Sequence, residues 1–417
     1  MNDSGSLERR LGVTDAVVIG AGSMIGAGVF ASWAPAARAA GDWLLLGLAI
    51  AGVVAFCNAA SSAQLAALHP ESGGTYVYGR KQLSHFWGHV AGWGFVVGKT
   101  ASCSAMALTI GAYLWPDQQR LTAVLAVIVI TAVNIGGLTR TVAVTKVLLV
   151  VSVTALAIVV YTARFLDGDG EGALLAEPLA GDGDPYGVMR SAAFMFFAFA
   201  GYARIATLGE EVKDPERTIP RAIPLALFGV LGLYTIVGLV ALDAVGAEVL
   251  AASDAPLRAI MILDDSPLEP IVQVGAGIAS LGVLLNLIPG VSRTTLAMAR
   301  NRELPGWFAH IDAQRSLPLR AELTVAAVVI VLVLTLDITN SIAVSGVAIL
   351  TYYAITNAAA LTLGDDERRW PAAIAVVGLI GCVVLVAALP PAALLGGGIV
   401  LVAGVLARQV ALRTGNG

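Results

Sequence analysis

The stretch VVIGAGSMIGAGVFASWAPAA, residues 17–37, determines how the rest of the chain is interpreted. It is apolar and long enough to cross a bilayer, which takes about 20 residues of helix. Four glycines interrupt it: Gly20, Gly22, Gly26 and Gly28. Hydrocarbon offers no water to satisfy a freed backbone N–H or C=O. A glycine cluster at this depth therefore predicts a broken helix whose freed backbone groups have a function. The freed backbone groups of such a break are suited to bind a small zwitterion.

The composition indicates a membrane protein. Of the 417 residues, 57% are hydrophobic and 13% are charged, and the mean hydropathy is +0.82. A soluble globule needs a more polar surface, so we predict an all-α polytopic membrane protein. No small-residue cleavage site follows the first apolar run, which we therefore expect to stay and direct insertion. The three cysteines and four histidines are spread too widely for a disulfide or a metal site, and we expect no metal, no cofactor and no nucleic-acid partner.

Hydrophobic runs of membrane length predict about twelve helices. Their centres fall near residues 25, 55, 98, 128, 152, 198, 233, 284, 329, 350, 380 and 400. Lys and Arg gather in the segments on the same side as the N-terminus, such as residues 80–81 and 213–221, whereas acidic residues dominate the other side, notably residues 167–184. This asymmetry predicts a multi-pass plasma (inner) membrane protein with both termini in the cytoplasm.

A second interrupted helix follows five spans later. Residues 195–205, MFFAFAGYARI, place a glycine and small residues inside the sixth predicted span. Small residues also let helices pack closely, and Gly22 with Gly26 fits that explanation as well. However, two breaks separated by an odd number of spans are typical of inverted five-helix repeats, in which both breaks line one site. The second break therefore favours a site over simple packing.

The repeats divide the chain into five parts. Helices 1–5 occupy residues 12–165 and helices 6–10 occupy residues 187–364. The remaining parts are a cytoplasmic tail at residues 1–11, an acidic outer loop at 166–186, and helices 11–12 with the C-terminal tail at 365–417.

Four motifs in this order resemble the amino acid–polyamine–organocation (APC) transporters. The sequence GSMIGAGVF at residues 22–30 is similar to the first-helix signature of that superfamily. Residues 58–79, with PESGGTYVYG, resemble the end of its second helix and the following loop. Residues 197–223, with EEVKDPERTIPRAI, resemble its sixth helix and inner loop, and residues 292–305 resemble the end of its eighth helix. The resemblance implies the leucine-transporter-type fold, a 5+5 inverted repeat with broken helices 1 and 6.

The resemblance also implies a backbone site for an amino acid. The substrate carboxylate would be held by N–H groups at the start of the second half of helix 1, which correspond to Ile25, Gly26, Ala27 and Gly28. These groups lie at the positive end of a helix dipole. The substrate ammonium would be held by the carbonyls of Met24, Phe197 and Ala200.

Selectivity for the substrate side chain must come from residues around this backbone. The candidates by position are Phe197 and Phe199 on helix 6, Ser102 and Met106 on helix 3, and Asn286 or Leu287 on helix 8. None is acidic, whereas a cationic side chain at membrane depth would need an acidic partner. We therefore predict neutral amino acids as substrates. For Met106 and Asn286, ordinary helix packing is an equally good explanation. Phe199 and Tyr202 are placed to act as outer-side lids.

Ionisable residues within spans are candidates for coupling and gating. Lys99 lies in the middle of helix 3, where it either exchanges a proton during transport or caps carbonyls freed by a break. The lysine that couples protons on helix 5 of relatives corresponds to Ser152 here, and Lys146, about two turns closer to the cytoplasm, is expected to extend to the interface. Arg204 could close the inner side of the site with Glu210 or Glu211.

The sequence therefore predicts a secondary amino acid transporter that works by alternating access in the lipid bilayer, with protons as the candidate coupling ion. An amino acid or amine exchanger or exporter, and a cationic amino acid transporter, stay open as alternatives, and a membrane-embedded sensor is a distant one. An enzyme is not expected, because no convergent His, Ser or carboxylate groups lie at membrane depth. The oligomeric state is left open.

Overall fold

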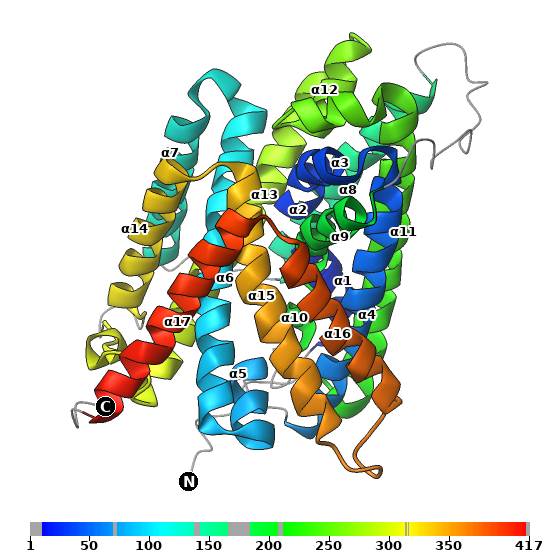
Figure 1. Cartoon of the computed structure of the whole chain (residues 1–417). Helices are drawn as coiled ribbons and strands as arrows, with labels where there is room; N and C mark the ends of the chain where they lie inside the picture. Colours follow the sequence, from blue (N-terminus) through cyan, green and yellow to red (C-terminus); the bar gives the residue numbers. More distant parts are fainter. Residues whose placement is uncertain are drawn as a thin grey trace.

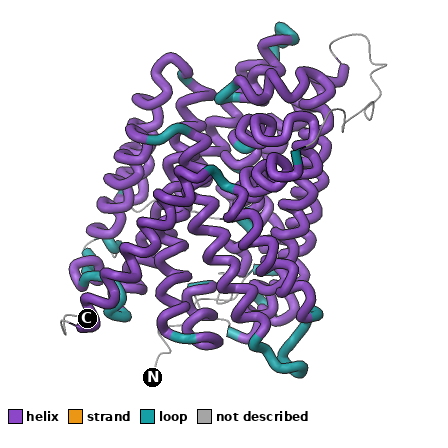
Figure 2. Tube along the Cα trace, viewed as in Figure 1, coloured by secondary structure: helices purple, strands orange, loops and turns teal. Residues whose placement is uncertain are grey.

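The computed structural model describes residues 11–69, 73–136, 142–165, 184–206, 212–312, 315 and 317–413. Within these ranges the chain is helical throughout, and its only extended pairings are two isolated bridges, Leu11 with Val212 and Asp312 with Leu317. Figure 2 shows helices joined by short loops and turns. The prediction of an all-helical architecture is confirmed for the described residues.

The described helices, in chain order, are α1 (Val13–Met24), α2 (Ala27–Ala31), α3 (Trp33–Ala40), η1 (Gly41–Trp43), α4 (Leu44–Leu68), α5 (Thr75–Tyr78), η2 (Gly79–Leu83), α6 (His85–Leu114), η3 (Pro116–Gln118), α7 (Gln119–Ile135), α8 (Val142–Phe165), α9 (Pro185–Phe199), α10 (Ala203–Ala206), α11 (Pro215–Ala252), α12 (Pro256–Leu263), α13 (Glu269–Arg300), η4 (Gly306–Ala309), α14 (Leu319–Thr335), α15 (Ile338–Leu361), α16 (Ala372–Ala388) and α17 (Pro391–Arg413).

Nine segments among the described residues are long and apolar enough to cross a membrane. The other three predicted centres, near residues 198, 329 and 380, fall on α9, α14 and α16, which have 15, 17 and 17 residues. A count of twelve spans, and the division into two inverted repeats, therefore stay predictions.

The long helices run side by side as a bundle with two distinct ends (Figure 1). The short helix α5 and the C-terminal end of α17 lie at one end, which we call the α5 end. The short helices α3 and α12 lie at the opposite end, which we call the α12 end. Between the two ends, α2, α9 and α10 lie to the right of α15 in the view of Figure 1.

Central and peripheral helices differ in how much of their surface is covered by protein. Of the apolar span of α6, 89% is buried, compared with 22% for α8. The close packing of α6 depends on small residues: a Cβ at Gly98 would approach the Ile349 side chain to 2.6 Å, so α15 can lie directly against it. The peripheral helices instead expose large apolar side chains, including Val147 and Val150, as expected of a surface that faces hydrocarbon.

Candidate functional site

The first break lies where the glycine cluster predicts it. Helix α1 ends at Met24, and α2 begins at Ala27. Between them Ile25 has φ −77° and ψ 73°, and Gly26 has φ −139° and ψ −145°, so neither residue is helical. The hydroxyl of Ser23, the polar side chain beside the break, donates to the carbonyl of Ile19 at 2.7 Å. The site at this break therefore consists of backbone groups.

The second break directly contacts the first. Helix α9 ends at Phe199, and the chain turns through Ala200, Gly201 and Tyr202 before α10. A Cβ at Gly201 would overlap the carbonyl of Ser23 and come within 2.6 Å of the Met24 nitrogen. A Cβ at Gly28 would likewise lie 2.6 Å from the Cα of Ala198. Two segments far apart in the sequence thus meet backbone to backbone inside the bundle, beside α2 and α9 in Figure 1.

Two of the four amide groups predicted to hold a carboxylate donate within the chain. The Ile25 N–H donates to the Ala21 carbonyl at 2.7 Å, and the Gly26 N–H donates to the Met24 carbonyl at 2.9 Å. Ala27 and Gly28 are the first residues of α2, where N–H groups have no carbonyl of the same helix to bind. The donors suited to an anion are therefore those of Ala27 and Gly28.

The carbonyls predicted to hold an ammonium are all engaged by groups of the protein itself. The Tyr234 hydroxyl lies 2.8 Å from the Met24 oxygen and 3.2 Å from the Ala198 oxygen. The Lys99 ammonium donates to the Ala200 carbonyl at 3.1 Å. The Phe197 carbonyl accepts from the Ala200 N–H at 3.3 Å. An incoming ammonium must therefore displace a donor that the chain supplies.

Lys99 is buried at the point where α6, α9 and α15 meet. Its side chain is 8% exposed, and the Tyr353 hydroxyl lies 3.5 Å from the same Ala200 oxygen. The ring of Tyr353 packs against that of Tyr202 in a tilted arrangement, with centroids 5.2 Å apart. No ion pair among the described residues joins Lys99 to a carboxylate. The geometry matches the capping role that the sequence left open, because the ammonium satisfies a carbonyl freed by the break.

The side chains around the breaks differ in part from those that the sequence singled out. Phe197 and Met106 are buried, and the Phe199 ring packs against Tyr234 at a centroid distance of 5.3 Å. On α13, Val283 faces Gly26, whereas Asn286 is exposed and Leu287 is half-buried. Ser102 points to α15, where its hydroxyl lies 2.8 Å from that of Ser345. The structure therefore brings Val283 to the break and does not bring Asn286 or Ser102 there.

The other candidates for coupling and gating make different contacts. Lys146 forms an ion pair with Asp15 at 3.2 Å and is half-exposed, as expected of a side chain that extends to the interface. Ser152 is buried and donates to the Leu148 carbonyl of its own helix at 2.8 Å. Arg204 is exposed on α10, and Glu210 and Glu211 lie outside the described residues.

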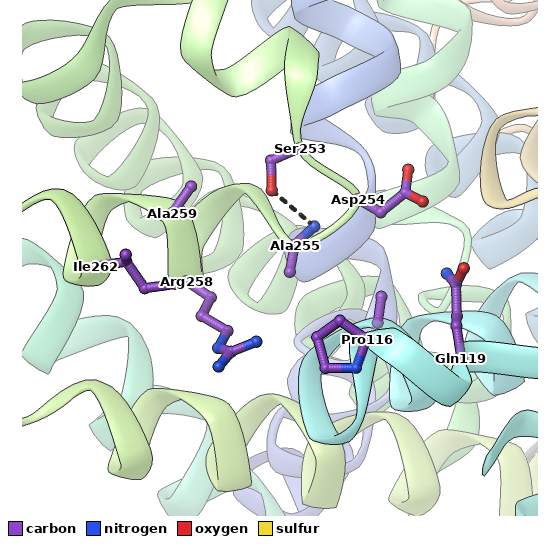
Figure 3. Close-up of a pocket in the computed structure, with 9 residues that line it drawn as sticks. Pro116, Gln119, Ser253, Asp254, Ala255, Arg258, Ala259 and Ile262 are labelled. Atoms are coloured by element: carbon purple, nitrogen blue, oxygen red, sulfur yellow. Dashed lines mark hydrogen bonds between the residues drawn. The ribbon is translucent and has the colours of Figure 1, made fainter.

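Tyr113 joins α2 to α12 next to Ala112, which lines a cavity at the α12 end. Figure 3 shows this cavity, with a volume of about 240 Å³, between the start of α7 and the α11–α12 turn. The Tyr113 hydroxyl donates to the Phe30 carbonyl of α2 at 3.0 Å and accepts from the Leu257 N–H of α12 at 3.3 Å. Sequence reasoning missed Tyr113, because it is one aromatic residue in a long apolar helix.

Replacement of Tyr234 by phenylalanine is expected to destabilise the protein in the absence of substrate. The Met24 and Ala198 carbonyls share the single hydroxyl proton of Tyr234, and its removal deprives these buried oxygens of that donor, at a cost of about 1–3 kcal/mol. The thermal unfolding midpoint of the purified protein should fall, whereas Tyr186→Phe, at an exposed position, should leave it unchanged. Equal midpoints for Tyr234→Phe and the unmodified chain would contradict the assigned hydrogen bonds.

The fold and site together define a class of protein. A bundle of apolar helices encloses a buried centre made of backbone at two adjoining breaks, as in transporters with discontinuous membrane helices. Residues 11–406 match the sequence profile of the amino acid permease family, and the chain therefore belongs to that family, within the APC superfamily. It is a multi-pass membrane protein and a transporter rather than an enzyme.

Individual relatives carry different names. An uncharacterised transporter of Mycobacterium tuberculosis is 55% identical over 409 residues, covering 97% of this chain and 91% of the relative. Cationic amino acid transporter 7 of Arabidopsis thaliana is 27% identical over 88% of this chain and 68% of its own length. A branched-chain amino acid permease of Bacillus subtilis is 23% identical over 75% and 72%.

Proposed function

We propose that the chain is a secondary amino acid transporter of the plasma membrane, in which the α1–α2 and α9–α10 breaks bind the substrate and alternating access exposes it to each side. The observation that carries the proposal is the backbone contact of Gly201 with Ser23 and Met24 inside the bundle. The N–H groups of Ala27 and Gly28 bind the carboxylate. The carbonyls of Met24 and Ala200 bind the ammonium. The α5 end faces the cytoplasm.

The substrate side chain in this proposal is neutral. Val283 faces Gly26 and Phe197, near the end of α9, is a buried apolar side chain, whereas the buried Lys99 ammonium lies 3.1 Å from the Ala200 carbonyl. A cationic side chain would bring a second positive charge next to Lys99 at membrane depth, which is costly. Among the names of the distant relatives, the branched-chain permease therefore fits this site better than the cationic transporters.

Proton exchange is the coupling that the Lys99 contact favours. The substrate ammonium and the Lys99 ammonium compete for the Ala200 carbonyl. Two ammonium groups at one acceptor repel each other, so substrate binding favours loss of the Lys99 proton. Substrate and proton then cross in opposite directions, as in the exchanger that the sequence left as an alternative. In this scheme the twelve spans form two inverted repeats, residues 12–165 and 187–364, followed by helices 11–12.

Uptake of labelled amino acids into proteoliposomes tests both the function and the coupling. We expect uptake of neutral amino acids that is faster and more concentrative when the lumen is acidic than when the outside is acidic, with no dependence on sodium. Stimulation by an acidic exterior would instead indicate proton symport and reject exchange. Absence of uptake and of counterflow for every amino acid would reject the proposed function.

A further inference from the structure

A buried polar cluster at the α5 end takes no part in the site described above. Glu303 follows α13 and is 7% exposed, and His89 on α6 is fully buried. The Arg80 guanidinium lies 3.4 Å from one Glu303 carboxylate oxygen, Oε1, and donates to the Tyr76 hydroxyl at 2.7 Å. The second carboxylate oxygen, Oε2, lies 3.9 Å from His89 Nδ1. The cluster thus joins α5, η2 and α6 to the end of α13.

The hydrogen bonds of His89 define which of its nitrogens carries a proton. Nε2 lies 3.2 Å from the carbonyl oxygen of Gly404 on α17. A carbonyl only accepts, so Nε2 must be the donor, and Nδ1 of the neutral ring then carries a lone pair. This lone pair faces Glu303 Oε2, and neither atom has a hydrogen-bond partner within the described structure. Two buried acceptors that face each other lack one proton between them.

The surrounding charges do not already neutralise this pair. Arg80 pairs with the other oxygen of Glu303, and Arg408 on α17 and His85 at the start of α6 act on Glu303 by charge alone. Burial raises the pKa of the Glu303 carboxyl above its usual value, although Tyr76 and Arg80 beside it oppose the shift. Burial and the Glu303 charge raise the pKa of Tyr76 to about 12, so its hydroxyl stays neutral. Tyr76 therefore keeps its own proton, and the unpartnered atoms that face each other are His89 Nδ1 and Glu303 Oε2.

We propose that His89 Nδ1 and Glu303 Oε2 form a binding site for one proton, and that the bound proton closes a hydrogen bond between α6 and the end of α13. The proton resides on Nδ1, as an imidazolium–carboxylate pair, or on Oε2, as a carboxylic acid that donates to Nδ1. Both forms satisfy the two facing atoms.

The site is placed to control movement at the α5 end. Small residues bring its elements together: a Cβ at Gly88 would lie 3.0 Å from the Arg80 nitrogen, and one at Gly92 would lie 2.7 Å from the Tyr76 ring. A proton between His89 and Glu303 ties these packed elements to α13, so acidification stabilises the arrangement seen in the structure. In the transport cycle, which rests on the proposed function, this slows the rearrangement that opens the α5 end.

The substitution Glu303→Gln supplies the missing hydrogen without a proton from solution, because its amide donates to Nδ1 while its carbonyl still accepts from Arg80. The unfolding midpoint of the unmodified protein should lie roughly 2–4 °C below that of Glu303→Gln at about pH 8, and the gap should close as the pH falls to about 5. The sign follows because the folded state binds a proton that the unfolded state lacks near neutral pH. The exposed His310→Gln serves as the matched control and should follow the unmodified protein. Parallel pH profiles for the unmodified protein and Glu303→Gln would overturn the proposal.

A second test uses counterflow with equal pH on both sides of the membrane, so that no pH gradient drives the exchange. The unmodified protein should exchange amino acid roughly 3- to 10-fold more slowly at about pH 5 than at about pH 8. This factor is what remains after any pH effect common to all three proteins has been divided out. Glu303→Gln should be slow at both values, and His89→Phe should be fast at both. The same acid response in all three proteins would overturn the site. The unfolding profiles need no transport, so they test the proton site even if the chain carries no amino acid.

Discussion

Replacement of Gly201 by alanine is expected to abolish transport and to lower the unfolding midpoint. The added methyl group would overlap the Ser23 carbonyl and lie 2.6 Å from the Met24 nitrogen. Both atoms belong to backbone, so no side-chain rotation can relieve the overlap and the two breaks must separate. Overpacking of this kind costs about 1–3 kcal/mol or more. Since each 1.4 kcal/mol changes affinity about tenfold, this cost corresponds to a loss of substrate affinity of roughly 5- to 150-fold.

Gly232→Ala provides a matched control for this substitution. Gly232 lies inside α11, and a Cβ there meets no atom within 4 Å. The same methyl group should therefore leave uptake unchanged and the unfolding midpoint equal or slightly higher, because alanine favours helix over glycine. If Gly201→Ala binds and carries substrate as the unmodified protein does, the contact between the breaks is not the binding site.

Local sequence signals were sufficient to locate both breaks. The glycines around Met24 and Gly201 interrupt apolar runs. A helix break in hydrocarbon costs free energy, because the freed backbone groups find no water, so such interruptions indicate a site. The same reasoning placed Lys99 at depth. What bonds to Lys99 could not be read from the sequence, because the Ala200 carbonyl lies 101 positions away and any residue offers a carbonyl.

Other parts of the site depend on packing that no local pattern encodes. Position in the sequence suggested Asn286, whereas the rotation of α13 brings Val283 against Gly26 and leaves Asn286 exposed. Three residues along a helix rotate the direction of a side chain by only about 60°, but on α13 this step separates a buried position from an exposed one. His89 and Glu303 lie far apart in the sequence and become a pair only when α6 meets the end of α13.

Replacement of Lys99 by methionine is expected to uncouple transport from protons and to preserve exchange of one amino acid for another. Methionine has a similar length but no charge, so the Ala200 carbonyl loses the donor at 3.1 Å and becomes available to the substrate ammonium. With one proton per substrate, a pH difference of one unit supports about tenfold accumulation, because one pKa unit corresponds to 1.36 kcal/mol. The variant should show no such accumulation in proteoliposomes, while counterflow at equal pH continues with an affinity at least as high as that of the unmodified protein.

Lys146→Met separates a specific role of Lys99 from a general effect of removing a lysine. Lys146 pairs with Asp15 at a half-exposed position far from the breaks, so its loss should leave proton-driven accumulation intact. Lys99→Arg should also fail to couple, because a guanidinium keeps its proton at any accessible pH. Accumulation driven by a pH difference in Lys99→Met would exclude Lys99 as the proton carrier. The Ala200 contact would then be only a cap, because a coupling residue must change its charge once per cycle and a cap need never do so.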